Sequence, residues 1–246
     1  MLSSILSDYV KRHRYTRLQP LAALIDMDGT LYDSMGNHAE AWCRMCEENG
    51  LSVTREEFFL YEGMTGAGTI DILVQRCRGR HATEEECISL YRRKTEIFKE
   101  LPPVRPMPGA KDLTDLMKTV GMRRVLVTGS GQNSLLNRLD EDFPGVFTDG
   151  MRVTSRDVTR GKPHPEPYIR GMQIAGVTPS QAIAVENAPL GVKSAATAGA
   201  FTVGVVTGPV ARTELEAAGA AVVYDSMTEC AEEFPTLLYE MLTLSL

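Results

Sequence analysis

The chain has 246 residues, of which 43% are hydrophobic and 24% are charged, so it reads as a soluble globular protein of one or two domains and not as a disordered, collagen-like or low-complexity chain. Its formal net charge of −6 makes it a poor general binder of nucleic acid. No apolar run reaches the roughly 18 residues that a membrane span needs, and the first ten residues lack a signal-peptide core. We expect a cytoplasmic protein with neither a membrane nor a nucleic acid as partner.

Five short apolar segments predict β-strands. They are rich in Val, Ile and Ala without polar alternation, as strands buried on both faces of a parallel sheet are. These segments are residues 21–26, 123–129, 181–187, 201–206 and 220–225. Helical patterns that end in Gly lie between them, at 110–121, 164–176, 190–199 and 211–219. The alternation predicts an α/β fold with a doubly wound, mostly parallel sheet.

One long segment breaks this alternation. From residue 38 to 103 no strand signal occurs, and four helical patterns follow one another. Thr54 and Thr83 each precede a Glu by three residues, which is the pattern of a capping box at the start of a helix. A Pro-rich stretch at 102–109 closes the segment. We therefore predict an N-terminal extension, a discontinuous α/β core domain and an inserted helical cap domain: residues 1–20, 21–37 plus 104–246, and 38–103.

The five cysteines follow no disulfide-framework spacing, which indicates free thiols in a reducing compartment. Cys43 and Cys46 form a C-x-x-C, but they lie in a helical pattern with no second C-x-x-C and no nearby pair of histidines. We predict two buried helix cysteines here and no zinc or redox site.

Polar residues follow several of the predicted strands. In an open parallel sheet, ligands bind beyond the carboxyl ends of the strands, so these residues should meet at one edge. They are two carboxylates, a hydroxyl with two small neighbours, an acid–amide pair and a lysine in a proline-rich loop: Asp26, Asp28, Thr128, Gly129, Ser130, Glu186, Asn187 and Lys162. A single D-x-D motif is weak on its own, and the convergence of the set is the informative feature.

These side chains suit phosphoryl transfer through an aspartyl phosphate. The carboxylate of Asp26 can attack phosphorus and divide one difficult step into two. Asp28 can protonate the leaving oxygen and then activate water. Mg²⁺ would offset the repulsion between the carboxylates and a phosphate, and Lys162 would add a fixed positive charge. The Thr128 hydroxyl and the free N–H groups of the next two residues can hold phosphoryl oxygens.

Four ordered motifs resemble those of the haloacid dehalogenase-like superfamily, in the group that contains β-phosphoglucomutase and small sugar-phosphate phosphatases. They are LIDMDGTLYDS (24–34), VTGS (127–130), GKPHPEPY (161–168) and VENAPLGVKSAATAGA (185–200). The resemblance spans residues 22–240 and implies a Rossmann-like core with a helical cap. It further implies that Asp26 is the nucleophile and that Asp28 is the general acid and base. Thr128 and Lys162 are implied to bind the transferring phosphoryl group. Mg²⁺ is implied on the Asp26 side chain, the Asp28 carbonyl and the Glu186–Asn187 pair.

Two further residues are implied to be near the substrate. His38, ten residues after Asp28, matches a hinge histidine of the mutase branch that helps to align the acid/base; the alternative is an ordinary packed histidine. The loop 63–69, with Thr65, matches the cap loop and is expected to close over the substrate and exclude water.

Other positions depart from the family pattern. Asn187 stands where the family has a second acid, so it offers an oxygen without a charge. The Lys-Asn pair of the mutases is replaced by Gly131-Gln132, and the cap loop lacks the Arg of the mutases. A bisphosphorylated intermediate needs cationic contacts at its distal end, so these departures favour a phosphatase.

We therefore predict a Mg²⁺-dependent phosphatase of small phosphorylated metabolites, with sugar phosphates as the expected class. A phosphosugar mutase of the β-phosphoglucomutase type is the alternative, and a catalytically silent binding module with this fold ranks third. The sequence leaves the oligomeric state open, and a monomer is compatible with it.

Overall fold

The computed structural model describes residues 2–131, 133–148 and 150–244. Within them, a six-stranded sheet has the strand order β3-β2-β1-β4-β5-β6, and every pair of neighbours is parallel. The strands are β1 Ala22–Ile25, β2 Arg123–Val127, β3 Arg152–Val153, β4 Ala182–Glu186, β5 Phe201–Val205 and β6 Val222–Tyr224. The predicted α/β fold is confirmed, and each of the five predicted strands contains an observed one.

Strand β3 was not predicted. It has two residues and pairs with Leu126 and Val127 at the edge of the sheet. A strand this short carries no period that a sequence pattern can show.

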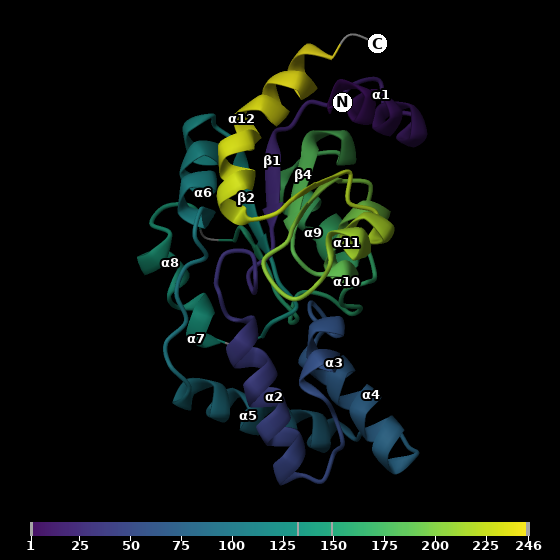
Figure 1. The fold of residues 1–246 in the computed structure, drawn as a ribbon, viewed down its shortest axis with the longest axis vertical. Helices are drawn as coiled ribbons and strands as arrows, with labels where there is room; N and C mark the ends of the chain where they lie inside the picture. The colour runs from purple at the N-terminus through teal and green to yellow at the C-terminus, as the bar shows by residue number, and fades with distance from the viewer. Residues whose placement is uncertain (1, 132, 149, 245–246) are drawn as a thin grey trace.

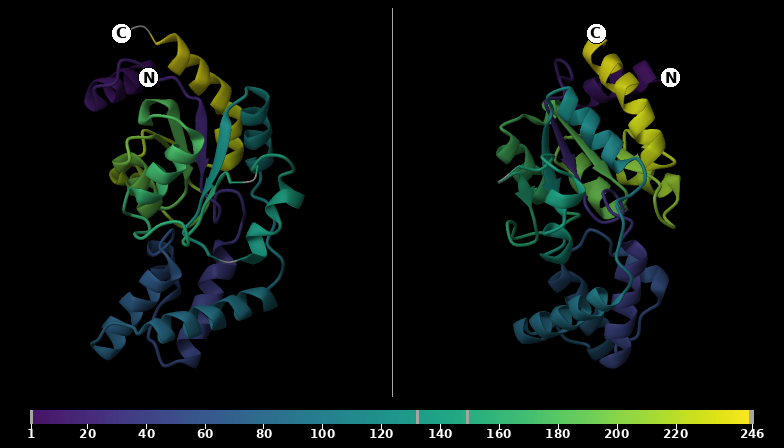
Figure 2. Two further views of the ribbon diagram at one scale, coloured as in Figure 1. Left: turned by 180° about the vertical axis from the view of Figure 1, so that it is seen from behind. Right: turned by 90° about the vertical axis from the view of Figure 1, so that its left-hand side faces the viewer.

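Helices cover both faces of the sheet (Figures 1 and 2). On one face lie α1 (Leu2–His13), α6 (Ala110–Thr119) and α12 (Met227–Thr243), and on the other lie α9 (Glu166–Ala175) and α10 (Pro189–Thr197). Alternate residues of β1 point to the two layers: Ala23 and Ile25 pack in the first cluster, and Ala22 and Leu24 in the second. Helix α11 (Arg212–Ala218) packs against β5 and β6, and the short helices η1 (Pro179–Gln181), α7 (Asn133–Leu136) and α8 (Leu139–Asp142) lie in connections.

The predicted N-terminal extension is mostly helix α1, and it is attached to the core. Leu6, Tyr9 and Val10 are buried, and the Tyr9 ring meets Phe201 of β5 edge-on at 4.9 Å between centroids. The hydroxyl of Tyr9 donates to the carbonyl of Gly199. This helix therefore completes one layer of the core.

Four successive helices lie at the end of the molecule opposite the two termini (Figure 1). They are α2 (Met35–Glu48), α3 (Arg55–Leu60), α4 (Gly66–Arg78) and α5 (Glu84–Glu100), and we call them the cap helices. Their positions agree with the four helical patterns of the sequence. On α2, Cys46 is buried as predicted, whereas Cys43 is only half-buried.

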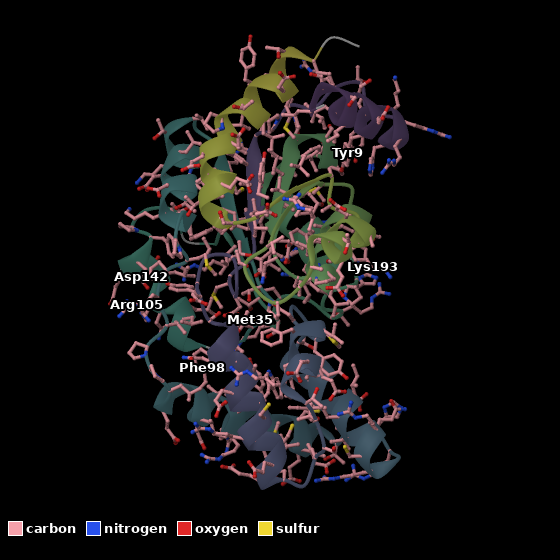
Figure 3. All side chains as sticks on the ribbon, in the orientation of Figure 1. Tyr9, Met35, Phe98, Arg105, Asp142 and Lys193 are labelled. Carbon is pink, nitrogen blue, oxygen red and sulfur yellow. The ribbon has the colours of Figure 1, made fainter. Side chains whose placement is uncertain are left out.

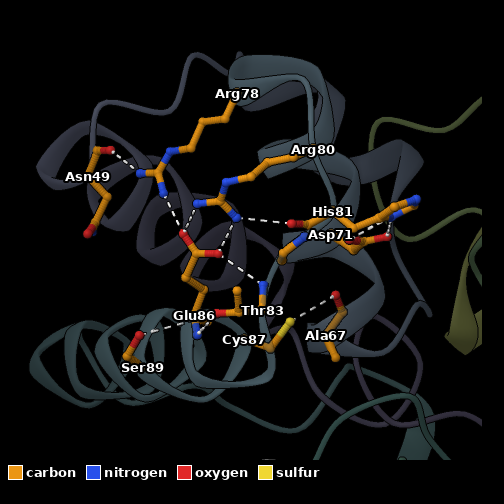
Figure 4. A network of polar contacts seen from close by, with 11 residues as sticks. Asn49, Ala67, Asp71, Arg78, Arg80, His81, Thr83, Glu86, Cys87 and Ser89 are labelled. Atoms are coloured by element: carbon orange, nitrogen blue, oxygen red, sulfur yellow. Dashed lines mark hydrogen bonds and ion pairs between the residues drawn. The ribbon is translucent and has the colours of Figure 1, made fainter.

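The predicted capping box at α5 is complete, and at α3 the glutamate half of the predicted box is present. At the start of α5, Thr83 Oγ1 accepts from the amide of Glu86, and the Glu86 carboxylate accepts from the amide of Thr83. The same carboxylate pairs with Arg78 and Arg80, which joins the start of α5 to the end of α4 (Figure 4). At α3, Glu57 accepts from the amide of Thr54. Among the described residues, none of the helices combines the length and the apolar character that crossing a membrane requires.

Candidate active site

The carboxyl ends of the central strands converge on one lysine. Lys162 Nζ lies 2.6 Å from Asp26 Oδ1, 2.5 Å from Glu186 Oε1 and 3.0 Å from the Val127 carbonyl. Asp26 follows β1 and Glu186 ends β4, which is the neighbour of β1 in the sheet. Tyr168 of α9 donates a hydrogen bond of 2.6 Å to the same Glu186 oxygen. The site is therefore built on the edge that strand alternation predicted.

The charges at this edge do not balance. The side chain of Lys162 is fully buried, and although burial lowers its pKa, the two carboxylates outweigh that effect and raise it, so the lysine stays charged. Burial and the charge of Glu186 raise the pKa of Asp26 to about 8, against the opposing effect of Lys162. If both carboxylates were ionised they would share one ammonium group, and this imbalance keeps the proton on Asp26 at neutral pH until a further cation binds.

Asp28 is held by two hydrogen bonds. Its Oδ1 accepts from Ser34 Oγ at 2.7 Å and lies 2.8 Å from His38 Nε2. Burial raises the pKa of Asp28, but His38 and Ser34 outweigh it and hold the pKa below its usual value. The structure thus places His38 against the predicted acid/base, as the resemblance implied.

Lys94 of α5 completes this chain of contacts and was missed in the sequence. Its Nζ lies 2.6 Å from His38 Nδ1, so a neutral His38 can accept from Lys94 and donate to Asp28. The lysine is 2% exposed, and burial lowers its pKa to about 7. A signal was present: Lys94 occupies the apolar stripe of α5 with Leu90, Ile97 and Phe98. A lysine at such a position is seldom fully buried unless it is paired.

Glu62 is a second missed residue. It lies in the segment between α3 and α4, and its Oε1 accepts a 2.6 Å hydrogen bond from Asn187 Nδ2. Asn187 Oδ1 in turn accepts from Thr30 at 3.1 Å. Burial raises the pKa of Glu62 well above its usual value, and the carboxylates of Asp26 and Glu186 raise it further. No local motif marks Glu62, because only the docking of the cap helices brings it here.

The predicted phosphate-binding loop follows β2. Thr128 is buried, and its Oγ1 accepts from the amide of Ser130 at 3.0 Å. The expectation that this amide is free for a phosphate is therefore wrong, because the threonine side chain closes a turn on it. Thr65 lies outside the cavity lining: its hydroxyl accepts from the amide of Gly68 and caps α4. Gln132 of the predicted Gly131-Gln132 pair lies outside the described residues.

The segment between α3 and α4 is seated directly on the core loops. A Cβ at Gly129 would collide with the backbone carbonyl of Gly63, and one at Gly161 would lie 2.7 Å from the Thr65 methyl group. A Cβ at Gly63 would lie 3.1 Å from Lys162 Cδ. Gly129 has no positive φ, so close approach, and not backbone conformation, calls for a glycine here.

A cavity of about 70 Å³ lies between the core and the cap helices. Figure 3 shows Met35, part of its lining, at the junction of the two parts. Core and cap residues face each other across it: Asp26, Asp28 and Thr128 from the core, and His38, Tyr91 and Lys94 from the cap helices.

The oxygen-rich, negatively charged edge of the cavity fits Mg²⁺. Among the described residues no three His, Cys, Asp or Glu side chains are arranged as a metal site. Mg²⁺ does not need such a set, because it takes one or two carboxylates together with water and substrate oxygens. The raised pKa values of Asp26 and Glu62 come from burial and mutual repulsion, which a divalent cation would relieve.

Asn187→Asp is expected to tighten Mg²⁺ binding about tenfold, because it adds a carboxylate charge beside Glu62, at the edge where we expect the metal. Without metal, the new carboxylate faces that of Glu62, so the melting temperature in EDTA should fall. Isothermal titration with Mg²⁺ and thermal melting measure the two effects. Gln173→Glu, which adds the same charge on the exposed side of α9, is the control. An unchanged Mg²⁺ titration in Asn187→Asp would place this residue away from the metal.

Known proteins resemble this chain in sequence. A family model described as haloacid dehalogenase-like hydrolase matches residues 21–199. Validoxylamine A 7'-phosphate phosphatase of Streptomyces hygroscopicus subsp. limoneus is 29% identical over 187 residues, which cover 75% of this chain and 85% of that protein. Hexitol phosphatase A of Escherichia coli K12 is 29% identical over 193 residues, which cover 74% and 81%.

A solved structure from Bacteroides vulgatus, provisionally assigned there as a beta-phosphoglucomutase, is 41% identical. It superposes with a TM-score of 0.94 over 98% of both chains. The family match covers well over half of the chain, and the strand-end residues of the resemblance meet at one site. The chain therefore belongs to the haloacid dehalogenase-like hydrolases.

Proposed function

We propose that the protein is a Mg²⁺-dependent phosphatase of small phosphorylated metabolites, with phosphorylated sugars or polyols as the class. The observation that carries the proposal is the meeting of Asp26, Asp28 and Thr128 in one cavity, with the buried Lys162 bonded to Asp26. The relatives named validoxylamine A 7'-phosphate phosphatase and hexitol phosphatase A support the substrate class.

Asp26 is the proposed nucleophile. Lys162 holds its Oδ1 and orients the carboxylate, and we assign the attack on phosphorus to Oδ2. The bond from phosphorus to the leaving oxygen breaks as the aspartyl phosphate forms. Water then cleaves the aspartyl phosphate, which releases inorganic phosphate and restores the carboxylate.

Asp28 is the proposed acid and base. It gives a proton to the leaving oxygen in the first step and takes one from the attacking water in the second. In the structure without substrate, its pKa is held low by His38 and Ser34. A bound phosphate would raise that pKa through charge repulsion, so Asp28 would gain its proton together with the substrate.

Asp26, the Asp28 carbonyl, Glu186 and Asn187 are the residues we propose for Mg²⁺. When bound, the ion would offset the charge of the phosphoryl oxygens and keep Asp26 ionised at neutral pH. Glu186 Oε1 is already engaged with Lys162 and Tyr168, so Asp26 and Asn187 are the more accessible donors.

We further propose a cap domain of residues 38–103 that opens for substrate entry, with residues 21–37 and 104–246 as the core domain. The proposed setting is the cytoplasm, with the substrate as the partner and no nucleic acid or membrane. The net charge of −6 and five free cysteines support it.

A phosphosugar mutase is the second candidate. The 41% identity to the Bacteroides vulgatus structure favours it, and Lys94 supplies a cation that the segment at 63–69 lacks. A lysine with a pKa near 7 is only partly charged at neutral pH, which is a weak contact for a distal phosphate.

A panel of phosphorylated metabolites separates the candidates. We expect Mg²⁺-dependent phosphate release that is fastest on one or a few sugar or polyol phosphates, measured with malachite green. In parallel, β-glucose 1-phosphate seeded with the glucose bisphosphate tests for glucose 6-phosphate formation. Isomer formation much faster than phosphate release would show a mutase. No turnover of any compound, aryl phosphates included, would support a silent module.

A further inference from the structure

The cavity between the core and the cap helices has two unlike walls. The core side holds the groups of the proposed phosphoryl chemistry, among them Asp26, Asp28 and Thr128. The cap side adds two methionines and four aromatic residues, which are Met35, Met64, Trp42, Phe58, Tyr61 and Tyr91. This apolar wall takes no part in the proposed transfers of protons and of the phosphoryl group. It can therefore contact the part of the substrate that leaves.

Trp42 lies one helical turn beyond the residue that contacts the acid/base. His38 Nε2 is 2.8 Å from Asp28 Oδ1, near the start of helix α2, which runs away from the core (Figure 1). Trp42 follows His38 by four residues, so the two side chains lie on one face of the helix, about 6 Å apart along its axis. Both residues line the cavity. Since Asp28 is proposed to protonate the leaving oxygen, Trp42 lies on the side toward which the leaving group extends.

The indole ring of Trp42 is held in place by its neighbours. The ring of Phe58 lies nearly parallel to it, with 5.7 Å between the centroids and an interplanar angle of 12°. Lys94 Nζ lies over the indole, 5.4 Å from the ring centroid. Trp42 is only 8% exposed, yet it borders the cavity. An apolar group that is already fixed loses little further entropy when a ligand packs against it.

The charges around the cavity disfavour a leaving group with a second anionic group. Within the lining that the structure describes, Lys94 is the only lysine or arginine, whereas Asp26, Asp28 and Glu62 bring carboxyl groups. Lys94 Nζ already contacts His38 Nδ1 at 2.6 Å. A second phosphate or a carboxylate would therefore meet one engaged cation and three acids. Uncharged C–H groups can instead be buried against the indole without such a cost.

We propose that Trp42 is a specificity-determining residue that contacts the leaving group, which rests on the proposed phosphatase function. It favours phosphate monoesters whose leaving group is uncharged and contains a ring with an apolar face, such as the C–H groups of a pyranose. An acyclic three-carbon leaving group offers little C–H surface to the indole and gains little from this contact.

The fluorescence of Trp42 tests the contact directly, because this residue is the single tryptophan of the chain. The Asp26→Asn protein, which should bind substrate without turnover, is titrated with the ring-containing sugar phosphate hydrolysed fastest by the wild type. A second titration uses inorganic phosphate. We expect a saturable change in emission with the sugar phosphate and little change with inorganic phosphate. No change with the sugar phosphate, or an equal change with both, overturns the role of Trp42.

Steady-state kinetics of Trp42→Leu test the specificity. On the same sugar phosphate, KM should rise about tenfold while kcat changes less than about twofold, because the contact is made equally in the ground state and the transition state. On glycerol 3-phosphate, both constants should change less than about twofold. Trp42→Phe keeps a ring beside Phe58 and should give an intermediate KM, so the test does not depend on the leucine variant alone.

Phe59→Leu is the matched control, because it removes a half-buried ring of the same cap helices that does not line the cavity. It should leave the kinetics on both substrates unchanged. An equal loss on both substrates in Trp42→Leu, or no loss on either, overturns the specificity role. Wild-type enzyme that hydrolyses neither substrate contradicts the phosphatase proposal instead, so the two failures are distinguishable.

Discussion

Asp26→Asn is expected to abolish Mg²⁺-dependent hydrolysis of an aryl phosphate, with a loss of about 10⁴-fold or more in kcat. The amide has almost the same shape as the carboxylate but cannot attack phosphorus. Lys162 keeps its contacts with Glu186 and the Val127 carbonyl, so its charge remains paired. Because one of two competing buried carboxylates is removed, the melting temperature should not fall. Activity and thermal melting are measured on the same preparation.

Asp112→Asn is the control for Asp26→Asn. Asp112 lies exposed in the first turn of α6, away from the cavity, so its amide variant should retain wild-type activity. Wild-type activity in Asp26→Asn would assign the nucleophile to another group. Loss of folding in that variant would contradict the charge imbalance inferred at the strand ends.

Lys162→Met is expected to lower both activity and stability. The side chain is fully buried and is the counter-ion of Asp26 and Glu186. Its loss leaves the buried Glu186 carboxylate without a charged partner, which costs about 3–5 kcal/mol of unfolding free energy in EDTA at neutral pH, where Asp26 holds its proton. We also expect a loss of about 10³-fold in kcat/KM, because the carboxylate and the phosphoryl oxygens lose a fixed positive charge.

The stability deficit of Lys162→Met depends on pH in a defined direction. The pKa of Asp26 is about 8 even with the lysine present, which is above its value in the unfolded chain. Loss of the lysine raises this pKa further, so the variant and the wild type differ in the charge of Asp26 only from about pH 8 upward, and the deficit should grow as pH rises from about 7 to 9. Urea denaturation across this range measures it. Lys111→Met, which removes an exposed partner of Asp115, is the control. A pH-independent deficit would show that packing, and not charge, is lost.

Much of the site could be predicted because a parallel sheet brings the carboxyl ends of its strands to one edge. Asp26 and Glu186 end neighbouring strands, so their meeting on Lys162 follows from strand assignment and the four motifs. The fold could be predicted for the same reason, since buried strands and Gly-terminated helices alternate along the core.

The rest of the site depends on how the cap helices dock. Lys94 and Glu62 both belong to the cap segment. Lys94 contacts His38, which in turn contacts Asp28. Glu62 accepts a hydrogen bond directly from Asn187. No spacing rule relates these positions, because the contact crosses two separately packed parts. Lys94 on the apolar stripe of α5 was the one feature of the sequence that pointed to this contact. It indicated a buried charge but did not identify the partner of that charge.

The sheet order has a consequence for the synthesis of the chain. Strand β1 is made early but pairs with β2 and β4, both of which follow the cap helices in the sequence. The apolar residues of β1 therefore remain unpaired on the ribosome while residues 35–100 are added. The cap helices are contiguous in sequence and make many local contacts, so they can fold first as a compact unit. Strand β1 can pair only later, when β2 and β4 have been synthesised.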